Sequence, residues 1–107
     1  MNSRLIEVAS LLIDLEQELR VMNLWEFIEP SPDALASTEP FAIDTLTFPQ
    51  WLQFIFIPKM AFLIDQQTLP ANCSIAPMAE EYFAATQLAS NGLIRHLGTI
   101  DELITNG

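Results

Sequence analysis

The apolar residues at the start of the chain recur at alternating steps of three and four, which is the period of an α-helix with one buried face. They are Leu5, Val8, Leu12, Leu15, Leu19 and Met22. Polar side chains fall mostly on the other side of this helix, and Glu16 lies one turn from Arg20, where the two can form an ion pair. A helix with one apolar face has to bury that face against another element. Residues 3–23 are therefore predicted to form one helix of a bundle.

Prolines interrupt this helical pattern between residues 24 and 46, because proline cannot occupy a helix interior. Ser31, Pro32 and Asp33 match the N-cap, the first-turn proline and the first-turn acid of a short helix, so one helical turn through Ala36 is expected. A connection this long is typically functional or disordered. Its many apolar residues favour an ordered loop that packs on a neighbouring helix: Leu24, Trp25, Phe27, Ile28, Leu35, Phe41, Ile43 and Leu46.

A second helix is predicted for residues 48–67. Thr47 and Gln50 match a capping box at its start, and Pro58 predicts a kink in its middle. On a helical wheel its apolar and aromatic side chains point nearly all round, so one neighbouring helix could not bury them. This helix is therefore expected to be central, with the loop of residues 24–46 as a lid over its outer side.

Two further helices complete the predicted fold. Pro77 opens a helix over residues 76–90, and an apolar stripe predicts a last helix over residues 93–104. At 107 residues the chain fits one domain, so residues 1–107 are predicted to form a single all-α domain. The expected architecture is a four-helix bundle with a long ordered loop between helices 1 and 2 and a proline-kinked helix 2.

The net charge limits the classes of partner. Fourteen acidic residues against four basic ones give the chain a formal net charge of −10 at pH 7. Proteins that bind nucleic acids neutralise phosphates with clustered Lys and Arg, so direct binding to RNA, DNA or an anionic membrane is not expected. A basic protein partner is favoured instead, although the same charge would also serve solubility alone.

The sequence predicts neither membrane insertion nor export. The longest uncharged apolar-rich stretch, residues 45–58, is too short for a membrane span and is broken by prolines. The first seven residues include an early acid, and no cleavage site of small residues follows them. A secretory signal is therefore not expected, and a cytoplasmic location is.

Side chains that carry catalysis or bind metals are few. His96 and Cys73 are the only histidine and cysteine, and nothing local in the sequence pairs them as a base and a nucleophile. They leave too few ligands for a metal site, and the three glycines form no phosphate-binding loop. Asp101 and Glu102 are adjacent on a helix, so they diverge and are expected to lie on a solvated face. We therefore expect no enzyme activity, no cofactor and no metal.

Aromatic and acidic residues gather where the loop meets the second helix. The aromatic ones are Trp25, Phe41, Trp51 and Phe54, and the acidic ones are Glu26, Glu29, Glu39 and Asp44. Two interpretations stay open. In one, the aromatic residues are core and Asp44 accepts backbone N–H groups at the start of the second helix. In the other, aromatic anchors inside an acidic rim form a binding surface for a basic partner.

Motifs in the irregular, proline-rich segments are more specific than the helical stripes. They are Leu24-Trp25, Pro30, Pro32, Ser37-Thr38-Glu39-Pro40-Phe41, Asp44-Thr45, Gln50-Trp51-Leu52-Gln53, Ile57-Pro58-Lys59-Met60, Leu69-Pro70 and Ile75-Ala76-Pro77. With these motifs the chain resembles the YqcC family of small bacterial proteins. The resemblance implies a compact four-helix bundle without assigned catalytic residues, and genes commonly found beside, or occasionally joined to, a tRNA pseudouridine synthase of the TruC type. Lys59 stands where relatives often have arginine, so it joins the candidate interaction residues as a positive charge.

Two hypotheses of different classes follow. The first is a non-enzymatic accessory or interaction module whose basic partner is the TruC-type synthase. The alternative is a small-molecule binding module that uses the space between the second helix and the loop of residues 24–46. A homo-oligomer stays open.

Overall fold

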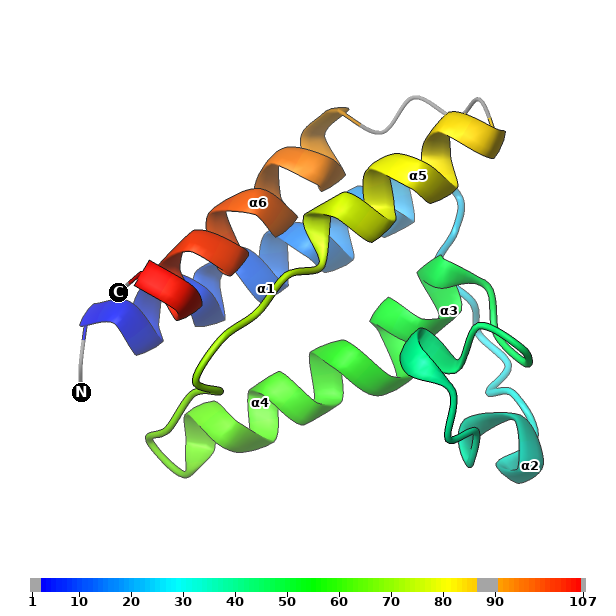
Figure 1. Cartoon of the computed structure of the whole chain (residues 1–107), viewed down its shortest axis with the longest axis horizontal. Coiled ribbons are helices and arrows are strands. Elements are labelled where there is room, and N and C mark those ends of the chain that lie inside the picture. The colour runs from blue at the N-terminus through cyan, green and yellow to red at the C-terminus, as the bar shows by residue number, and fades with distance from the viewer. Residues whose placement is uncertain (1–2, 87–90, 107) are drawn as a thin grey trace.

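In the computed structural model of this chain, which describes residues 3–86 and 91–106, every regular element is a helix (Figure 1). In chain order they are α1 (Ser3–Val21), α2 (Pro32–Leu35), the 3-10 turn η1 (Pro40–Ala42), α3 (Phe48–Trp51), the π-helical segment η2 (Leu52–Phe56), α4 (Ile57–Asp65), α5 (Ala76–Thr86) and α6 (Asn91–Asn106). The segments α3, η2 and α4 follow one another without a break and form one long helix. The all-α prediction is confirmed for the described residues.

The main helices alternate in direction along the chain and pack side by side (Figure 1). α1 contacts both α6 and α4, and α5 contacts α6. This arrangement is the predicted bundle of four long helices, with the loop of residues 24–46 between the first and the second. The predicted helix over residues 76–90 is confirmed as far as Thr86, and residues 87–90 lie outside the described part of the chain.

α1, rather than the second long helix, occupies the centre of the bundle. α1 and α6 supply six fully buried side chains, which are Val8, Leu15, Leu19, Leu93, Leu97 and Ile100. The prediction that the helix over residues 48–67 is central is wrong, because Phe62 on α4 is 63% exposed and its neighbour Ala61 is also exposed. α4 therefore lies at the edge of the bundle and buries one row of side chains against it.

α1 and α4 end in the same backbone motif. At the end of α1, Leu24 N–H donates to Leu19 C=O at 2.8 Å, and Asn23 N–H donates to Arg20 C=O at 3.1 Å. Asn23 has a φ of 61°, and Gln67, with a φ of 58°, ends α4 in the same way. This Schellman arrangement satisfies the last carbonyls of a helix but needs one residue in the left-handed region. Both ends lie where the sequence predicts them.

Side chains begin the helices as the sequence predicts. Gln50 N–H donates to Thr47 Oγ1 at 3.3 Å, and Thr47 N–H donates to Gln50 Oε1 at 2.8 Å, which completes the capping box of α3. Ser31 Oγ accepts the Ala34 N–H at 3.2 Å and so caps α2.

The distortion predicted at Pro58 takes the form of the π-helical segment η2. At its end, the Ile57 N–H donates to the Leu52 carbonyl, five residues back. Proline has no N–H, and its ring collides with the carbonyl four residues before it in a regular α-helix. A widened turn just before Pro58 relieves that collision, and π-helical turns often serve this purpose inside longer helices.

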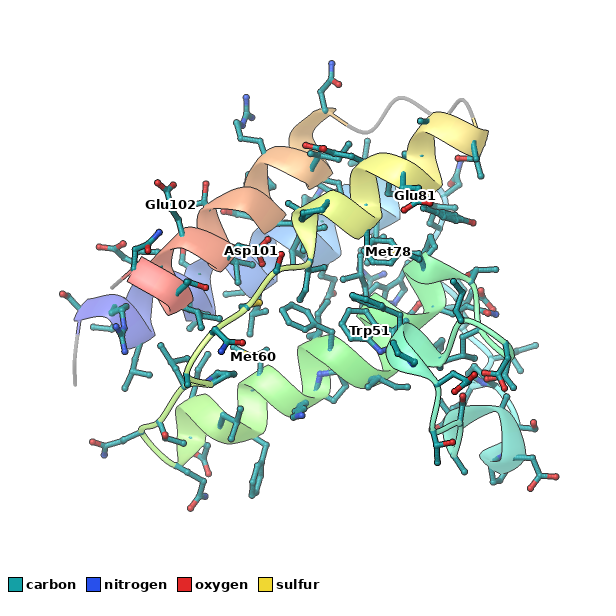
Figure 2. The ribbon with its side chains drawn as sticks, viewed as in Figure 1. Trp51, Met60, Met78, Glu81, Asp101 and Glu102 are labelled. Atoms are coloured by element: carbon teal, nitrogen blue, oxygen red, sulfur yellow. The ribbon has the colours of Figure 1, made fainter. Side chains whose placement is uncertain are left out.

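Asp101 on α6 caps the start of α5 and does not lie on a solvated face. Its carboxylate accepts the Ile75 N–H at 2.8 and 2.9 Å and the Ala76 N–H at 2.8 Å. Figure 2 shows Asp101 beside the chain that leads into α5. The expectation of a solvated pair is therefore wrong for Asp101, although Glu102 is exposed. First-turn N–H groups lack partners within their own helix, so a carboxylate from a neighbouring helix can satisfy them.

Candidate interaction surface

Two large apolar side chains stand in solvent at the start of the acidic loop, by which we mean residues 24–46. Phe27 is 89% exposed and Ile28 is 83% exposed. Glu26 and Glu29 flank them and are exposed as well. Exposed single apolar residues are common, but a Phe-Ile pair between two carboxylates combines apolar anchors with a charged rim.

Gln53 holds the backbone at the base of this exposed pair. Its Oε1 accepts the Glu26 N–H at 2.9 Å, and its Nε2 donates to the Glu26 C=O at 2.7 Å. Gln53 is 7% exposed and is the buried polar residue of the described core. The side chain of Glu26 also accepts a hydrogen bond from Gln50 Nε2 at 3.3 Å. The long helix therefore holds Glu26 in place through Gln50 and Gln53, which lie one turn apart. This contact also fixes the position of the backbone that leads into Phe27.

The acidic loop contains no basic residue. Its five acidic residues are all exposed: Glu26, Glu29, Asp33, Glu39 and Asp44. Asp44 accepts a hydrogen bond from the Ser37 hydroxyl rather than from backbone N–H groups at the start of α3. Thr47 caps that helix instead. The prediction that Asp44 accepts backbone N–H groups at this helix start is therefore wrong, whereas Thr47 does accept one. Thr45 donates from Oγ1 to the Ala34 carbonyl at 2.7 Å, and this bond ties the two halves of the loop together.

The predicted aromatic anchors are more enclosed than Phe27. Trp25 is half-buried, with the Arg20 guanidinium 4.8 Å from its ring centroid. The ring of Phe41 meets that of Trp51 edge-on, with 4.8 Å between the ring centroids, and Trp51 stacks on Phe56 with 5.4 Å between the centroids. Phe54 is half-buried. The contact between Phe41 and Trp51 joins the loop to the long helix. Trp25, Phe41 and Trp51 are partly buried and pack against the core.

Phe41 reaches Trp51 from an unusual backbone conformation. Phe41 and Ala42 have φ angles of 58° and 49°, so two consecutive residues with side chains lie in the left-handed region. Each costs about 1–2 kcal/mol relative to a right-handed conformation. The contacts of the Phe41 ring and the burial of Ala42 offset part of that cost. The 3-10 turn η1 therefore fixes Phe41 as one wall of an open cavity.

That cavity has a volume of about 400 Å³ and lies between the long helix and the segment of residues 70–75. Its lining residues are Phe41, Trp51, Ile55, Phe56, Lys59, Met60, Pro70, Asn72, Cys73, Ser74 and Ile75. Trp51 and Met60, both labelled in Figure 2, come from the long helix. Only Phe41 comes from the acidic loop, so the cavity lies beside the space predicted between loop and helix. Lys59 is exposed at this cavity.

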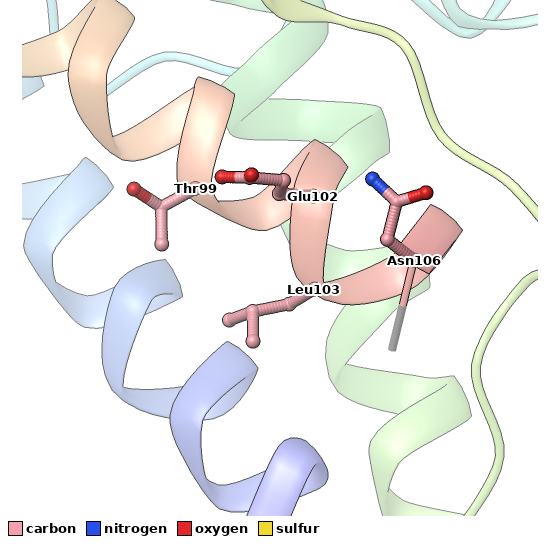
Figure 3. A pocket seen from close by; sticks show the side chains of 4 residues that line it. All are labelled: Thr99, Glu102, Leu103 and Asn106. Atoms are coloured by element: carbon pink, nitrogen blue, oxygen red, sulfur yellow. The ribbon is translucent and has the colours of Figure 1, made fainter.

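A second hollow, of about 270 Å³, lies on the surface of α6 alone (Figure 3). Thr99, Glu102, Leu103 and Asn106 line it, and all four belong to one helix. Ligand sites usually combine polar groups that converge from several elements. This hollow lacks that convergence.

The candidate catalytic side chains lie in separate surroundings. Burial and the neighbouring Asp101 raise the pKa of the Cys73 thiol to about 12, so it stays protonated at neutral pH and is a poor nucleophile. His96 Nε2 lies 3.9 Å from Glu18 Oε1 on α1. In residues 3–86 and 91–106 no group of three or more His, Cys, Asp or Glu side chains could hold a metal ion, and no helix is long and apolar enough to cross a membrane.

Comparison with known proteins finds the same relative by structure and by sequence. The solution NMR structure of YqcC from Escherichia coli matches with a TM-score of 0.84 and 31% identity, covering 98% of this chain and 91% of that one. The curated sequence of the uncharacterized protein YqcC from Escherichia coli strain K12 is 34% identical over 93 residues, which is 86% of this chain and 85% of the relative. The chain belongs to the YqcC family.

Three other matches, one to a family model and two to proteins, were found for this YqcC family member. An uncharacterized protein of Haemophilus influenzae is 39% identical over 93 residues, 86% of this chain and 87% of the relative. A family model described as tRNA pseudouridine synthase C matches residues 7–103. A protein named tRNA pseudouridine synthase C, from Pectobacterium carotovorum, is 40% identical over 65 residues, which is 61% of this chain but 17% of that protein. The similar part is therefore a small portion of the synthase from Pectobacterium.

Sequence reasoning missed Phe27, Ile28 and Gln53 as residues of the candidate surface. Phe27 and Ile28 were expected to pack because they lie among other apolar residues. Their position between Glu26 and Glu29 is the signal that could have marked them as exposed. Gln53 is the one polar residue among the apolar and aromatic ones from Trp51 to Ile57, and that isolation is a signal for a buried hydrogen-bonding role.

Proposed function

We propose that this YqcC family member is a non-enzymatic interaction module that docks onto a basic protein surface through its acidic loop. The observation that carries the proposal is the Phe27-Ile28 pair, exposed between Glu26 and Glu29. Energetic centres of interfaces are usually apolar or aromatic side chains surrounded by a polar rim. In this proposal Phe27 and Ile28 enter an apolar site on the partner, while the carboxylates face its basic residues.

The candidate partner is a tRNA pseudouridine synthase of the C type. An enzyme that binds tRNA needs basic surface for the phosphates, and an acidic module is complementary to such a surface. The relative from Pectobacterium supports this choice, because one protein there combines a segment similar to this chain with the name of the synthase. Residence in one chain keeps two modules at high effective concentration, which is useful when they act together.

Calorimetry of this protein with the C-type synthase from the same genome, at low and at high salt, tests the proposal. We expect binding that weakens as salt screens charges beyond roughly 8–10 Å. Replacing both anchors, by Phe27→Ala with Ile28→Ala, should weaken binding about thirtyfold or more. The matched control is Phe62→Ala, which removes an exposed apolar side chain from α4 and should leave binding unchanged.

Charge reversal tests the rim separately. Glu26→Lys with Glu29→Lys should weaken binding by about tenfold or more, with helix content checked by circular dichroism. An absence of binding at low salt, with both proteins folded, rejects the synthase as the partner. Binding that the anchor and charge variants leave unchanged rejects the acidic loop as the docking surface.

A second candidate function is small-molecule binding. The open cavity of about 400 Å³ beside Trp51 favours it, because this volume lies within the range of ligand sites and the walls are mainly apolar. A ligand there would not compete with a partner at Phe27 for the same residues.

A further inference from the structure

Aromatic rings form one wall of the cavity between the long helix and residues 70–75. Trp51 lies between Phe41, which meets it edge-on at 4.8 Å, and Phe56, which stacks on it at 5.4 Å. Phe56 is buried, while Phe41 and Trp51 each keep part of their surface exposed. A flat aromatic group gains most from a wall of this kind, because ring faces and edges attract one another beyond simple apolar contact.

Lys59 supplies the only charge among the residues that line this cavity. It is the single lysine of a chain with a net charge of −10. Among the described residues no carboxylate oxygen lies within 4.0 Å of its amino group, whereas Arg20 is paired with Glu16 at 2.9 Å. An unpaired ammonium at the edge of an apolar cavity favours a ligand with a negative group on an apolar body.

The side chains that line the opposite side of the cavity include polar ones, and none of them is charged. Asn72 and Ser74 are exposed there and can donate hydrogen bonds. The backbone N–H and C=O of Cys73, which lies between them, are already bonded to Thr105 Oγ1, both at 3.0 Å. This anchoring to α6 keeps the 72–74 segment in place, so the polar side of the cavity is preformed.

The net charge of the whole protein limits how much negative charge a ligand can carry. With fourteen acidic residues against four basic ones, a phosphate-rich ligand would be repelled by the protein as a whole and met by a single lysine. One carboxylate needs only one cation and suffers less repulsion. The cavity is therefore better suited to a monoanion than to a nucleotide.

We propose that this cavity binds a small aromatic monocarboxylate, with the ring against Trp51 and Phe41 and the carboxylate at Lys59. This inference rests on small-molecule binding as the second candidate function and adds the chemical class of the ligand. The proposed binding is reversible and noncovalent, because it uses only ring contacts and an ion pair.

Three probes that share the indole ring test the inference: indoleacetate, neutral indole and tryptamine, whose side chain ends in an ammonium. Each is titrated into protein labelled with nitrogen-15, and the NMR shifts of the backbone amides and of the tryptophan indole N–H groups are followed. We expect indoleacetate to bind with a Kd on the order of 1 mM or tighter, as suits a fragment of this size. The shifts should centre on Ser74, Asn72 and the indole N–H of Trp51, and tryptamine should bind more weakly than indole.

Lys59→Met removes the charge while keeping a flexible, helix-compatible side chain. It should weaken indoleacetate binding about two- to fivefold and leave indole unchanged. The control Arg95→Met removes an exposed cation on α6 that does not line the cavity, and it should change neither affinity.

The outcomes separate the inference from the function on which it rests. If indole and indoleacetate bind equally in the wild type, or Lys59→Met has no effect, the monocarboxylate is rejected although the cavity still binds ligands. If none of the probes shifts residues 72–74 at millimolar concentration, both the monocarboxylate and the ligand-binding function are rejected. Neither outcome bears on docking through Phe27 and Ile28.

Discussion

Replacing Gln53 with leucine should destabilise the protein and release the base of the exposed pair. The substitution keeps the volume of the side chain roughly constant but removes its bonds to Glu26 N–H at 2.9 Å and to Glu26 C=O at 2.7 Å. Gln53 itself is 7% exposed, so the leucine would sit in an apolar environment.

The expected loss is about 2 kcal/mol of unfolding free energy. Leaving a buried donor or acceptor without a partner costs about 1–3 kcal/mol for each group. Glu26 is exposed, so water can reach its backbone in part, and each group should cost about 1.5 kcal/mol, near the lower end of that range. The two groups together should then cost about 3 kcal/mol. Burial of the extra apolar surface of leucine returns about 1 kcal/mol. The measurement is urea denaturation followed by tryptophan fluorescence.

Two further variants make this test specific. Gln53→Glu keeps an acceptor for the Glu26 N–H but loses the donor to its carbonyl, so it should also destabilise. Gln17→Leu changes an exposed glutamine of α1 and should stay within about 0.5 kcal/mol of the wild type. Amide hydrogen exchange at Glu26, whose N–H donates to Gln53 Oε1, should become faster in Gln53→Leu. A loss below about 0.5 kcal/mol with unchanged exchange would show that Gln53 does not hold the acidic loop.

Three other predictions concern single positions. Asp101→Asn should cost about 1–2 kcal/mol in urea denaturation, because the amide has no negative charge at the helix start and keeps only one of the two oxygens that accept the Ile75 N–H; an unchanged midpoint would contradict its role as a cap. Gln67→Gly should stabilise by about 0.5–1 kcal/mol, because glycine adopts a φ of 58° without strain, whereas Gln66→Gly, at a φ of −83°, should bring no gain. The Cys73 thiol, with its pKa raised from 9.0 to about 12 by burial and Asp101, should react with iodoacetamide at pH 8 on the order of a hundred- to a thousandfold more slowly in the folded protein than in denaturant, and equal rates would contradict the raised pKa.

Local patterns in the sequence were sufficient for the helices and their ends. The capping box of Thr47 and Gln50, the cap of Ser31 and the apolar stripe of α1 each involve residues within one or two turns of one another. Such interactions depend on the spacing of residues along the chain, and that spacing can be read directly from the sequence. The predicted bundle follows from these local patterns together with the prolines between them.

The sequence could not predict contacts that join distant segments. Asp101 caps a helix that begins 25 residues earlier, and Gln53 binds Glu26 across 27 residues. Both contacts depend on how the helices pack against one another, so residue spacing along the chain does not predict them. The exposure of Phe27 and Ile28 is a similar case, because an apolar residue in an ordered loop can face either the bundle or solvent, and tertiary packing decides which.

The π-helical segment also affects the direction in which the long helix faces. Apart from Pro49, its buried apolar residues fall on every fourth position: Phe48, Leu52, Phe56, Met60 and Ile64. In a regular α-helix four residues turn through about 400°, so a row with this spacing would drift about 40° at each step and about 160° from Phe48 to Ile64.

A turn closed by a bond five residues back rotates less per residue, so η2 takes back part of this drift. The smaller rotation in η2 helps the side chains at both ends of the row to point toward the same core. The helical wheel, which assumes regular rotation, spreads the same residues over about 160°. Together with the exposed Ala61 and Phe62, this spread makes an edge helix look central. In this chain, a four-residue apolar period that runs across a proline therefore encodes a helix with one buried face and one widened turn.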